Sequence, residues 1–150
     1  MRLPKNAWRA EEMRFPVPLN AVVAHRWHCD HFGHLNARHY AAAFDDATFV
    51  FWSGLGFRPD SDSPMPVTLE VKISFRQEIP AGSVVRIEAQ VSKVGNKSVG
   101  LTFTMREAGG DELAICEVVE VFIHPKSRRS CPIPAALRAA LSKESHSPPG

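Results

Sequence analysis

The stretch HCDHFGHLNARHY, residues 28–40, decides the fold because a turn meets the start of a helix within it. It holds one carboxylate, Asp30, and a glycine, Gly33, which accepts backbone dihedrals that other residues resist. Five of the seven histidines of the chain lie between His25 and His39, so no other segment concentrates as many reactive groups. The stretch predicts an active-site loop that runs into the N-terminus of one long, buried helix.

A helical period begins at Asn36, a residue type that often caps helix N-termini. Gly54 or Gly56 can end the helix, since glycine is common just past a helix C-terminus. The aromatic run at residues 49–52 makes the far end apolar all round, which predicts burial in the core. The positions at i, i+3, i+4, i+7, i+11 and i+14 form one stripe: Tyr40, Ala43, Phe44, Ala47, Phe51 and Gly54.

Strands are predicted on both sides of this helix. Residues 19–27 form a first strand, and residues 57–66 a polar, proline-rich loop. Four segments rich in β-formers follow at residues 67–77, 83–94, 97–107 and 112–124, joined by connections short enough to require antiparallel pairing. Residues 134–142 favour a short helix. The expected fold is therefore α+β, with one long central helix covering a curved antiparallel sheet of about five strands.

Length and composition indicate one domain. The chain has 150 residues, 44% hydrophobic and 23% charged, with a net charge of only +2, which gives no argument for nucleic acid. Three cysteines fit a reducing compartment, and no run is long enough to cross a membrane, so a cytoplasmic protein is expected. The predicted organisation is an N-terminal arm at residues 1–18, one domain at 19–142 and a disordered tail at 143–150.

The pattern Asp-x-x-Gly-His-x-Asn-x-x-x-Tyr resembles that of the hotdog-fold acyl-CoA thioesterases, and more narrowly the 4-hydroxybenzoyl-CoA thioesterase-like group. Asp30, Gly33, His34, Asn36 and Tyr40 carry it, and the resemblance extends over about residues 19–141. It implies a helix wrapped by the sheet and a homodimer or tetramer. Two subunits would pair their sheets edge to edge, with the active sites at the interface.

The resemblance also implies roles for individual residues. Asp30 would serve as general base or nucleophile in hydrolysis of the thioester, and the backbone N–H of Ala37 would bind the oxyanion. Gly33, His34, Asn36 and Tyr40 would form the substrate pocket, and Lys97 would bind CoA. No cofactor is expected, because coenzyme A is part of the substrate. One departure is His28, where many relatives have a second acid.

Other interpretations of the same residues remain open. Without the surrounding motif, Asp30 is more typical of a turn or helix-capping aspartate than of a catalytic one, and Asp46 on the helix is a rival catalytic acid. Cys29 is more typical of a small buried residue than of a nucleophile. The third-position spacing of His25, His28, His31 and His34 permits a zinc or iron site, although we expect no metal. A non-catalytic acyl-CoA-binding protein or a dehydratase of the same fold is the alternative function.

Overall fold

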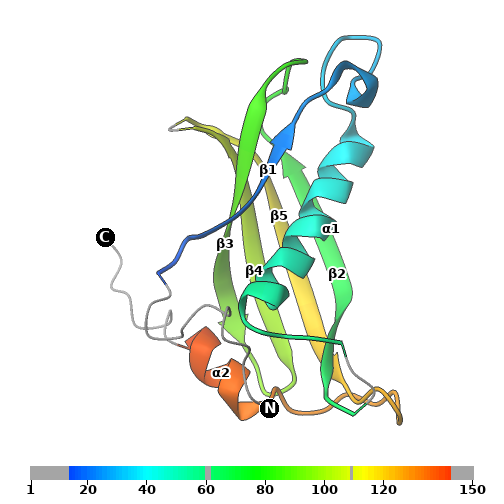
Figure 1. Ribbon diagram of the computed structural model, residues 1–150, viewed down its shortest axis with the longest axis vertical. Helices are drawn as coiled ribbons and strands as arrows, with labels where there is room; N and C mark the ends of the chain where they lie inside the picture. The colour runs from blue at the N-terminus through cyan, green and yellow to red at the C-terminus, as the bar shows by residue number, and fades with distance from the viewer. Residues whose placement is uncertain (1–13, 60–61, 109, 143–150) are drawn as a thin grey trace.

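One face of an antiparallel five-stranded sheet carries a long helix (Figure 1). The structure is a computed structural model that describes residues 14–59, 62–108 and 110–142. The strand order is β1-β3-β4-β5-β2, so β1 and β2 form the two edges. The elements are β1 (Val17–Val23), the 3-10 helix η1 (Arg26–His28), α1 (Ala37–Gly54), β2 (Met65–Phe75), β3 (Val84–Val94), β4 (Ser98–Glu107), β5 (Glu112–Ile123) and α2 (Ala135–Ser142). The predicted hotdog architecture is confirmed.

The prediction of the first strand was partly wrong. The strand begins at Val17 and ends at Val23, whereas residues 19–27 were expected. The chain turns away at Ala24, whose N–H donates to the carbonyl of Ser83 at 2.9 Å, and a 3-10 turn follows at Arg26–His28. Trp27, the last residue of the predicted strand, lies outside the sheet; it is 72% exposed, and its ring stacks on that of His25 with the centroids 4.3 Å apart. The four later strands lie within two residues of their predicted bounds.

Helix α1 begins and ends as its sequence indicates. The Oδ1 atom of Asn36 accepts a hydrogen bond from the N–H of Arg38 at 3.2 Å, which makes Asn36 the N-cap. Gly54 is the last helical residue, and Gly56 takes a φ of 86° where the chain leaves the helix. The predicted stripe is buried from Tyr40 to Phe51, and only its last member, Gly54, is half-buried.

The expectation that the aromatic run of α1 is buried was wrong for half of it. Phe51 and Trp52 lie in the core, but Phe49 is 70% exposed and Val50 37% exposed. A helix lying on a sheet buries only the side that faces it, and successive residues turn by about 100°. Phe49 instead borders a pocket between α1 and β2.

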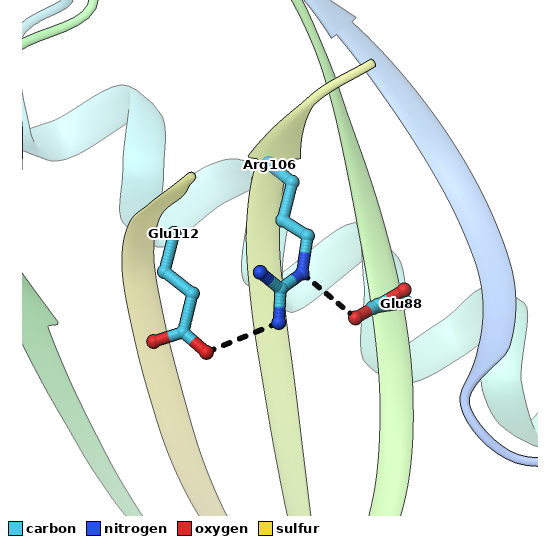
Figure 2. A network of polar contacts seen from close by, with 3 residues as sticks. All are labelled: Glu88, Arg106 and Glu112. Carbon is cyan, nitrogen blue, oxygen red and sulfur yellow. Dashed lines mark hydrogen bonds and ion pairs between the residues drawn. The ribbon is translucent and has the colours of Figure 1, made fainter. Parts of the chain in front are cut away.

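The core lies between α1 and the face of the sheet that it covers. Strands β3, β4 and β5 send alternate side chains into it, as their period-2 patterns predict. On the opposite face, the guanidinium of Arg106 in β4 joins Glu88 of β3 at 2.9 Å and Glu112 of β5 at 3.0 Å (Figure 2). These pairs raise the pKa of Arg106, chiefly through the hydrogen bond with Glu88. One face of the sheet is thus apolar and the other polar.

Helix α2 packs at the end of the sheet where β3 turns into β4 (Figure 1). Its residues Leu137, Ala140 and Leu141 are buried, and the side chain of Arg138 donates to the carbonyl of Gly95. The tail predicted at 143–150, and residues 1–13 of the predicted arm, lie outside the described residues. Among the helices that the structure describes, none is long and apolar enough to cross a membrane.

Candidate active site

Asp30 organises the loop that precedes α1. Its Oδ1 accepts hydrogen bonds from the N–H groups of Phe32 at 2.9 Å and His34 at 3.3 Å, and its own N–H donates to the carbonyl of His34 at 2.9 Å. Gly33 provides the required φ of 80°. One carboxylate oxygen therefore holds the turn. The other oxygen, Oδ2, accepts no hydrogen bond from the described part of the chain, so it is available to a substrate or a water molecule.

The loop is fixed against the segment that follows β2. The N–H of Leu35 donates to the carbonyl of Ile79 at 2.8 Å, and the N–H of Ala81 donates to the carbonyl of Gly33 at 3.1 Å. The imidazole of His34 lies 3.4 Å from the carboxylate of Glu78. Because backbone bonds on both sides hold this loop, Asp30 sits on a rigid support rather than on a free surface loop.

A cavity of about 330 Å³ opens beside this loop. The loop and the first turn of α1 supply Asp30, Phe32, His34, Leu35, Ala37 and Tyr40. The end of β2 and the residues after it supply Phe75, Arg76, Gln77 and Glu78. Of the residues predicted for the site, the fold thus brings Asp30, His34, Ala37 and Tyr40 to one cavity. Gly33 and Asn36 do not line it; they shape the turn and the helix start.

The N-terminus of α1 presents an open hydrogen-bond donor. The side-chain oxygen of Asn36 accepts from the backbone N–H of Arg38, and the backbone carbonyl of Asn36 accepts from the N–H of His39 at 2.9 Å. Within residues 14–59, 62–108 and 110–142, nothing accepts from the N–H of Ala37. A free N–H at the positive end of a helix is suited to bind a developing negative charge. This donor and Asp30 line the same cavity.

Tyr40 forms the inner wall of the cavity. Its side chain is 3% exposed, and its ring meets the edge of Phe75 with the centroids 5.0 Å apart. Burial raises the pKa of Tyr40, and the negative charges of Glu78 and Asp30 raise it further. The phenol therefore remains neutral and able to donate a hydrogen bond.

The sequence interpretation assigned no site role to six residues of the cavity: Phe32 and Leu35 within the Asp30 loop, and residues 75–78. Phe75 ends the period-2 pattern of β2, so the alternation places it on the same sheet face as Ile73. That pattern indicated burial but not a cavity, and Phe75 is 55% exposed. Gln77 and Glu78 follow the strand without any pattern. Only the pairing of the loop with residues 79–81 reveals their position.

Lys97 lies away from this cavity. It is exposed in the turn between β3 and β4, whereas the Asp30 loop adjoins the opposite end of β3 through the bond between Ala24 and Ser83. Strand β3 has 11 residues, so its ends are roughly 33 Å apart. Within one chain, the structure does not bring Lys97 to Asp30.

The clustered histidines pack against aromatic rings and against one another. His25 stacks on Trp27, and His28 lies 4.4 Å from His39 between ring centroids. Desolvation lowers the pKa of His39, and His28 and Arg38 lower it further by repulsion. Among the residues that the structure describes, no three His, Cys, Asp or Glu side chains lie together as metal ligands would. The cysteines at 29, 116 and 131 are free thiols, and Cys29 is half-buried.

A second pocket, of about 580 Å³, lies between α1 and the start of β2. Glu120 of β5 lines it and is only 1% exposed. The hydroxyl of Thr68 donates to its Oε1 at 2.9 Å. Burial, with a smaller contribution from the charge of Asp45, raises the pKa of Glu120 to about 7 against the opposing effect of the Thr68 hydrogen bond. Asp45 borders this pocket, whereas the rival acid Asp46 is exposed and lines neither cavity.

The sequence indicates the burial of Glu120, although the sequence interpretation overlooked it. The inward positions of β5 alternate as Ala114, Cys116, Val118, Glu120 and Phe122. A charged residue in such an apolar series is unusual, since carboxylates are rarely buried without a partner.

Comparisons with known proteins agree with this architecture. The profile of a family described as the thioesterase-like superfamily matches residues 23–141. No curated protein matches the chain.

Solved structures with the same fold include a hypothetical protein from Staphylococcus aureus in complex with CoA, at 20% identity and a TM-score of 0.77, over 92% of this chain and 90% of that one. The 1,4-dihydroxy-2-naphthoyl-CoA thioesterase from Synechocystis is similar at 13% identity and a TM-score of 0.72, over 87% and 98%. The probable thioesterase YbaW from Escherichia coli has 21% identity and a TM-score of 0.69, over 84% and 97%.

Proposed function

Because the chain belongs to the thioesterase-like superfamily and is a thioester hydrolase by that membership, we propose that it hydrolyses acyl-CoA thioesters to the free acid and CoA. The observation that carries the proposal is the cavity in which the carboxylate of Asp30 and the open N–H of Ala37 meet. The similar fold of a protein that binds CoA supports CoA as the thiol part of the substrate. The motif from Asp30 to Tyr40 supports the narrower 4-hydroxybenzoyl-CoA thioesterase-like group.

In this mechanism the two groups act on the two ends of the thioester carbonyl. The Oδ2 atom of Asp30 either takes a proton from the attacking water or itself attacks the carbonyl carbon. The carbonyl oxygen gains negative charge, which the N–H of Ala37 stabilises at the helix N-terminus. The C–S bond then breaks and CoA leaves as the thiolate. Attack by Asp30 would form an anhydride, which a water molecule hydrolyses in a second step.

The surrounding residues hold these groups in place. Gly33 and the backbone of His34 keep the Asp30 carboxylate oriented, and Asn36 caps the helix so that the N–H of Ala37 stays open. Tyr40 and Phe75 form an apolar wall that excludes water from one side of the thioester. Exclusion of water strengthens the hydrogen bond to the oxyanion.

We further propose that the active form is a homodimer joined through the open edge of β2. This strand exposes Leu69 by 70%, Val71 by 53% and Phe75 by 55%, which is unfavourable for an isolated edge. A two-fold axis near Glu70 would place Phe75 of one copy opposite Met65 of the other. The turn that carries Lys97 lies at the Met65 end, so the pairing would bring Lys97 of one copy toward Asp30 of the other.

The test of this proposal is Asp30→Asn, measured by thiol release from a panel of acyl-CoA thioesters. Asparagine retains an oxygen that accepts the hydrogen bonds of Phe32 and His34, so the loop should keep its shape while the catalytic charge is lost. We expect kcat to fall by about a hundredfold or more, with the circular dichroism spectrum unchanged.

The matched control is Asp46→Asn, which removes a carboxylate from the exposed side of α1 and should leave kcat unchanged. Full activity of Asp30→Asn would refute the mechanism. A wild-type protein that binds acyl-CoA without releasing thiol would be a binding protein instead. Hydrolysis with enzyme in excess, limited to a single turnover in ¹⁸O-labelled water, tests for the nucleophilic role of Asp30. A general base delivers the label to the released acid, whereas an anhydride opened by water at the Asp30 carbonyl carbon leaves the label in the Asp30 carboxylate.

A further inference from the structure

A second carboxylate shares the cavity with Asp30. Glu78 lies in the segment after β2 and lines the same cavity. The backbone of His34 pairs with that of Pro80, and this pairing brings Glu78 to the Asp30 loop. Burial raises the pKa of Tyr40, and the negative charges of Glu78 and then of Asp30 raise it further, so both carboxylates lie near this one phenol. The cavity therefore contains two acids, of which the proposed hydrolysis uses only Asp30.

The imidazole of His34 connects Glu78 to the loop that carries Asp30. Its Nε2 atom lies 3.4 Å from a carboxylate oxygen of Glu78. A neutral imidazole has one N–H donor and one acceptor nitrogen, so a carboxylate beside Nε2 favours the hydrogen on Nε2 and leaves Nδ1 as the acceptor. Among the described residues, none donates a hydrogen bond to Nδ1. The side chain is 32% exposed, so it can accept a proton in the cavity and release it to solvent.

The turn around Asp30 does not depend on this imidazole. The backbone N–H of His34 donates to Oδ1 of Asp30, and the backbone carbonyl of His34 accepts from the N–H of Asp30. Backbone groups therefore hold the turn, whichever side chain stands at position 34. An imidazole that lines the cavity without holding the loop is a candidate for a part in the chemistry.

Hydrolysis through an anhydride requires a base other than Asp30. Once the Asp30 carboxylate has attacked the thioester, it is part of the anhydride and has lost the charge that would accept a proton from water. Another group at the cavity must then activate the water. An imidazole oriented by a carboxylate is a common general base, and His34 with Glu78 provides this pair.

We propose that His34 is the base of this second step and that Glu78 positions its imidazole. This role rests on the proposed function and requires Asp30 to be the nucleophile. Nδ1 of His34 takes one proton from water, and the water oxygen attacks a carbonyl carbon of the anhydride. The bond from that carbon to the bridging oxygen breaks, which regenerates Asp30 and releases the acid, with the remaining hydrogen of the water on one of the two carboxyl groups. The imidazolium then passes its proton to the CoA thiolate or to solvent.

The test is His34→Gln, mixed rapidly with an acyl-CoA that the wild-type protein hydrolyses. Glutamine leaves the backbone bonds of the loop in place but cannot act as the base. Because the first step should survive, we expect a burst of one thiol per active site, followed by a steady-state rate about a hundredfold below that of wild type. Hydroxylamine added after the burst should release the accumulated acyl group as its hydroxamate.

Two further substitutions distinguish a base from a structural residue. Imidazole added to the medium should restore part of the steady-state rate of His34→Ala and none of that of Asp30→Asn. Glu78→Ala should lower kcat by about tenfold, as expected for the loss of one hydrogen bond that orients the base. Glu78→Gln keeps an oxygen that can accept from Nε2 and should be closer to wild type.

The matched controls are His31→Gln, which changes an exposed imidazole of the same loop, and Glu117→Gln, which changes an exposed glutamate of β5. Both should retain the kcat of wild type. An unchanged kcat in His34→Gln, or a lower kcat without the burst, would overturn this inference, while thiol release by the wild-type protein would leave the proposed function intact. If the wild-type protein releases no thiol from any acyl-CoA, the proposed function fails and the role of His34 fails with it.

Discussion

At the level of single residues, Asp30 and Glu120 are carboxylates in opposite surroundings. Asp30 lies in a half-exposed turn where two backbone N–H groups stabilise its charge. Glu120 lies in the core, where one hydroxyl approaches it and burial favours its protonated form. The first arrangement suits a group that must be ionised to react. The second suits a group that must stay uncharged within an apolar pocket.

The pKa of Glu120 predicts how stability depends on pH. It is about 7 in the folded protein against an ordinary value of 4.5, so the folded state holds this proton more tightly and loses stability as pH rises from 4.5 to 7. Glu120→Gln cannot ionise. Its free energy of unfolding should exceed that of wild type by about 3 kcal/mol at pH 8, and by far less at pH 5. Urea unfolding at the two pH values measures this.

The control for that experiment is Glu117→Gln, whose exposed side chain should alter stability little at either pH. Asp45 and Arg58, the other charged residues that line the pocket, are not substituted in either variant. An effect of Glu120→Gln that is equal at pH 5 and pH 8 would contradict the buried, proton-binding carboxyl.

Sequence reasoning at this level found Asp30 but not Glu120. Asp30 belongs to a local motif, whose residues are close together in the sequence and can be recognised without the structure. The burial of Glu120 follows from the pairing of β5 with β2, which joins residues 52 positions apart. The same limit applies to Glu78, which reaches the cavity only because the Asp30 loop pairs with residues 79–81.

At the level of elements, the role of the α1 N-terminus in binding the oxyanion can be tested by removing one backbone N–H. Ala37→Pro eliminates the N–H that we assign to the oxyanion, yet proline is favoured at the first position of a helix. The residue before it, Asn36, already has φ −70° and ψ 143°, which suits a residue preceding proline. We expect a folded protein whose kcat for acyl-CoA hydrolysis falls by about a hundredfold.

Ala37→Ser is the control, since it keeps the N–H and should retain activity close to that of wild type. Thiol release and thermal unfolding, measured on both variants, separate catalysis from stability. An active Ala37→Pro enzyme would assign the oxyanion to another donor. Unfolding of the variant without loss of activity per folded molecule would have the same meaning.

The elements themselves were predictable because their patterns are local. The alternation of β3 and β4 and the stripe of α1 are periodic, so their burial follows from residue spacing. The errors arose where an apolar residue served another purpose. Trp27 stacks on a histidine outside the sheet, and Phe49 borders a pocket instead of entering the core.

At the level of the whole molecule, the open edge of β2 predicts the assembly. Leu69→Glu combined with Val71→Glu places two charges on the surface that we assign to the dimer. We expect the mass from sedimentation velocity to halve, and thiol release to fall with it because each cavity loses its neighbouring chain. Val84→Glu, which charges an equally apolar and 50% exposed position at the start of β3, is the control and should leave the mass unchanged. A dimer that survives the double change would exclude the β2 edge as the interface.

The strand order β1-β3-β4-β5-β2 also affects how the protein is made. Strands β3, β4 and β5 follow one another and can pair as soon as they are synthesised, whereas β2 must wait for β5. At ribosomal speeds of about 5–20 residues per second, β5 begins to be synthesised roughly two to seven seconds after β2 is complete. During that interval both edges of β2, with its apolar Leu69 and Val71, lack a partner. Nascent chains would therefore be most prone to aggregate, or to require a chaperone, in the window between residues 75 and 112.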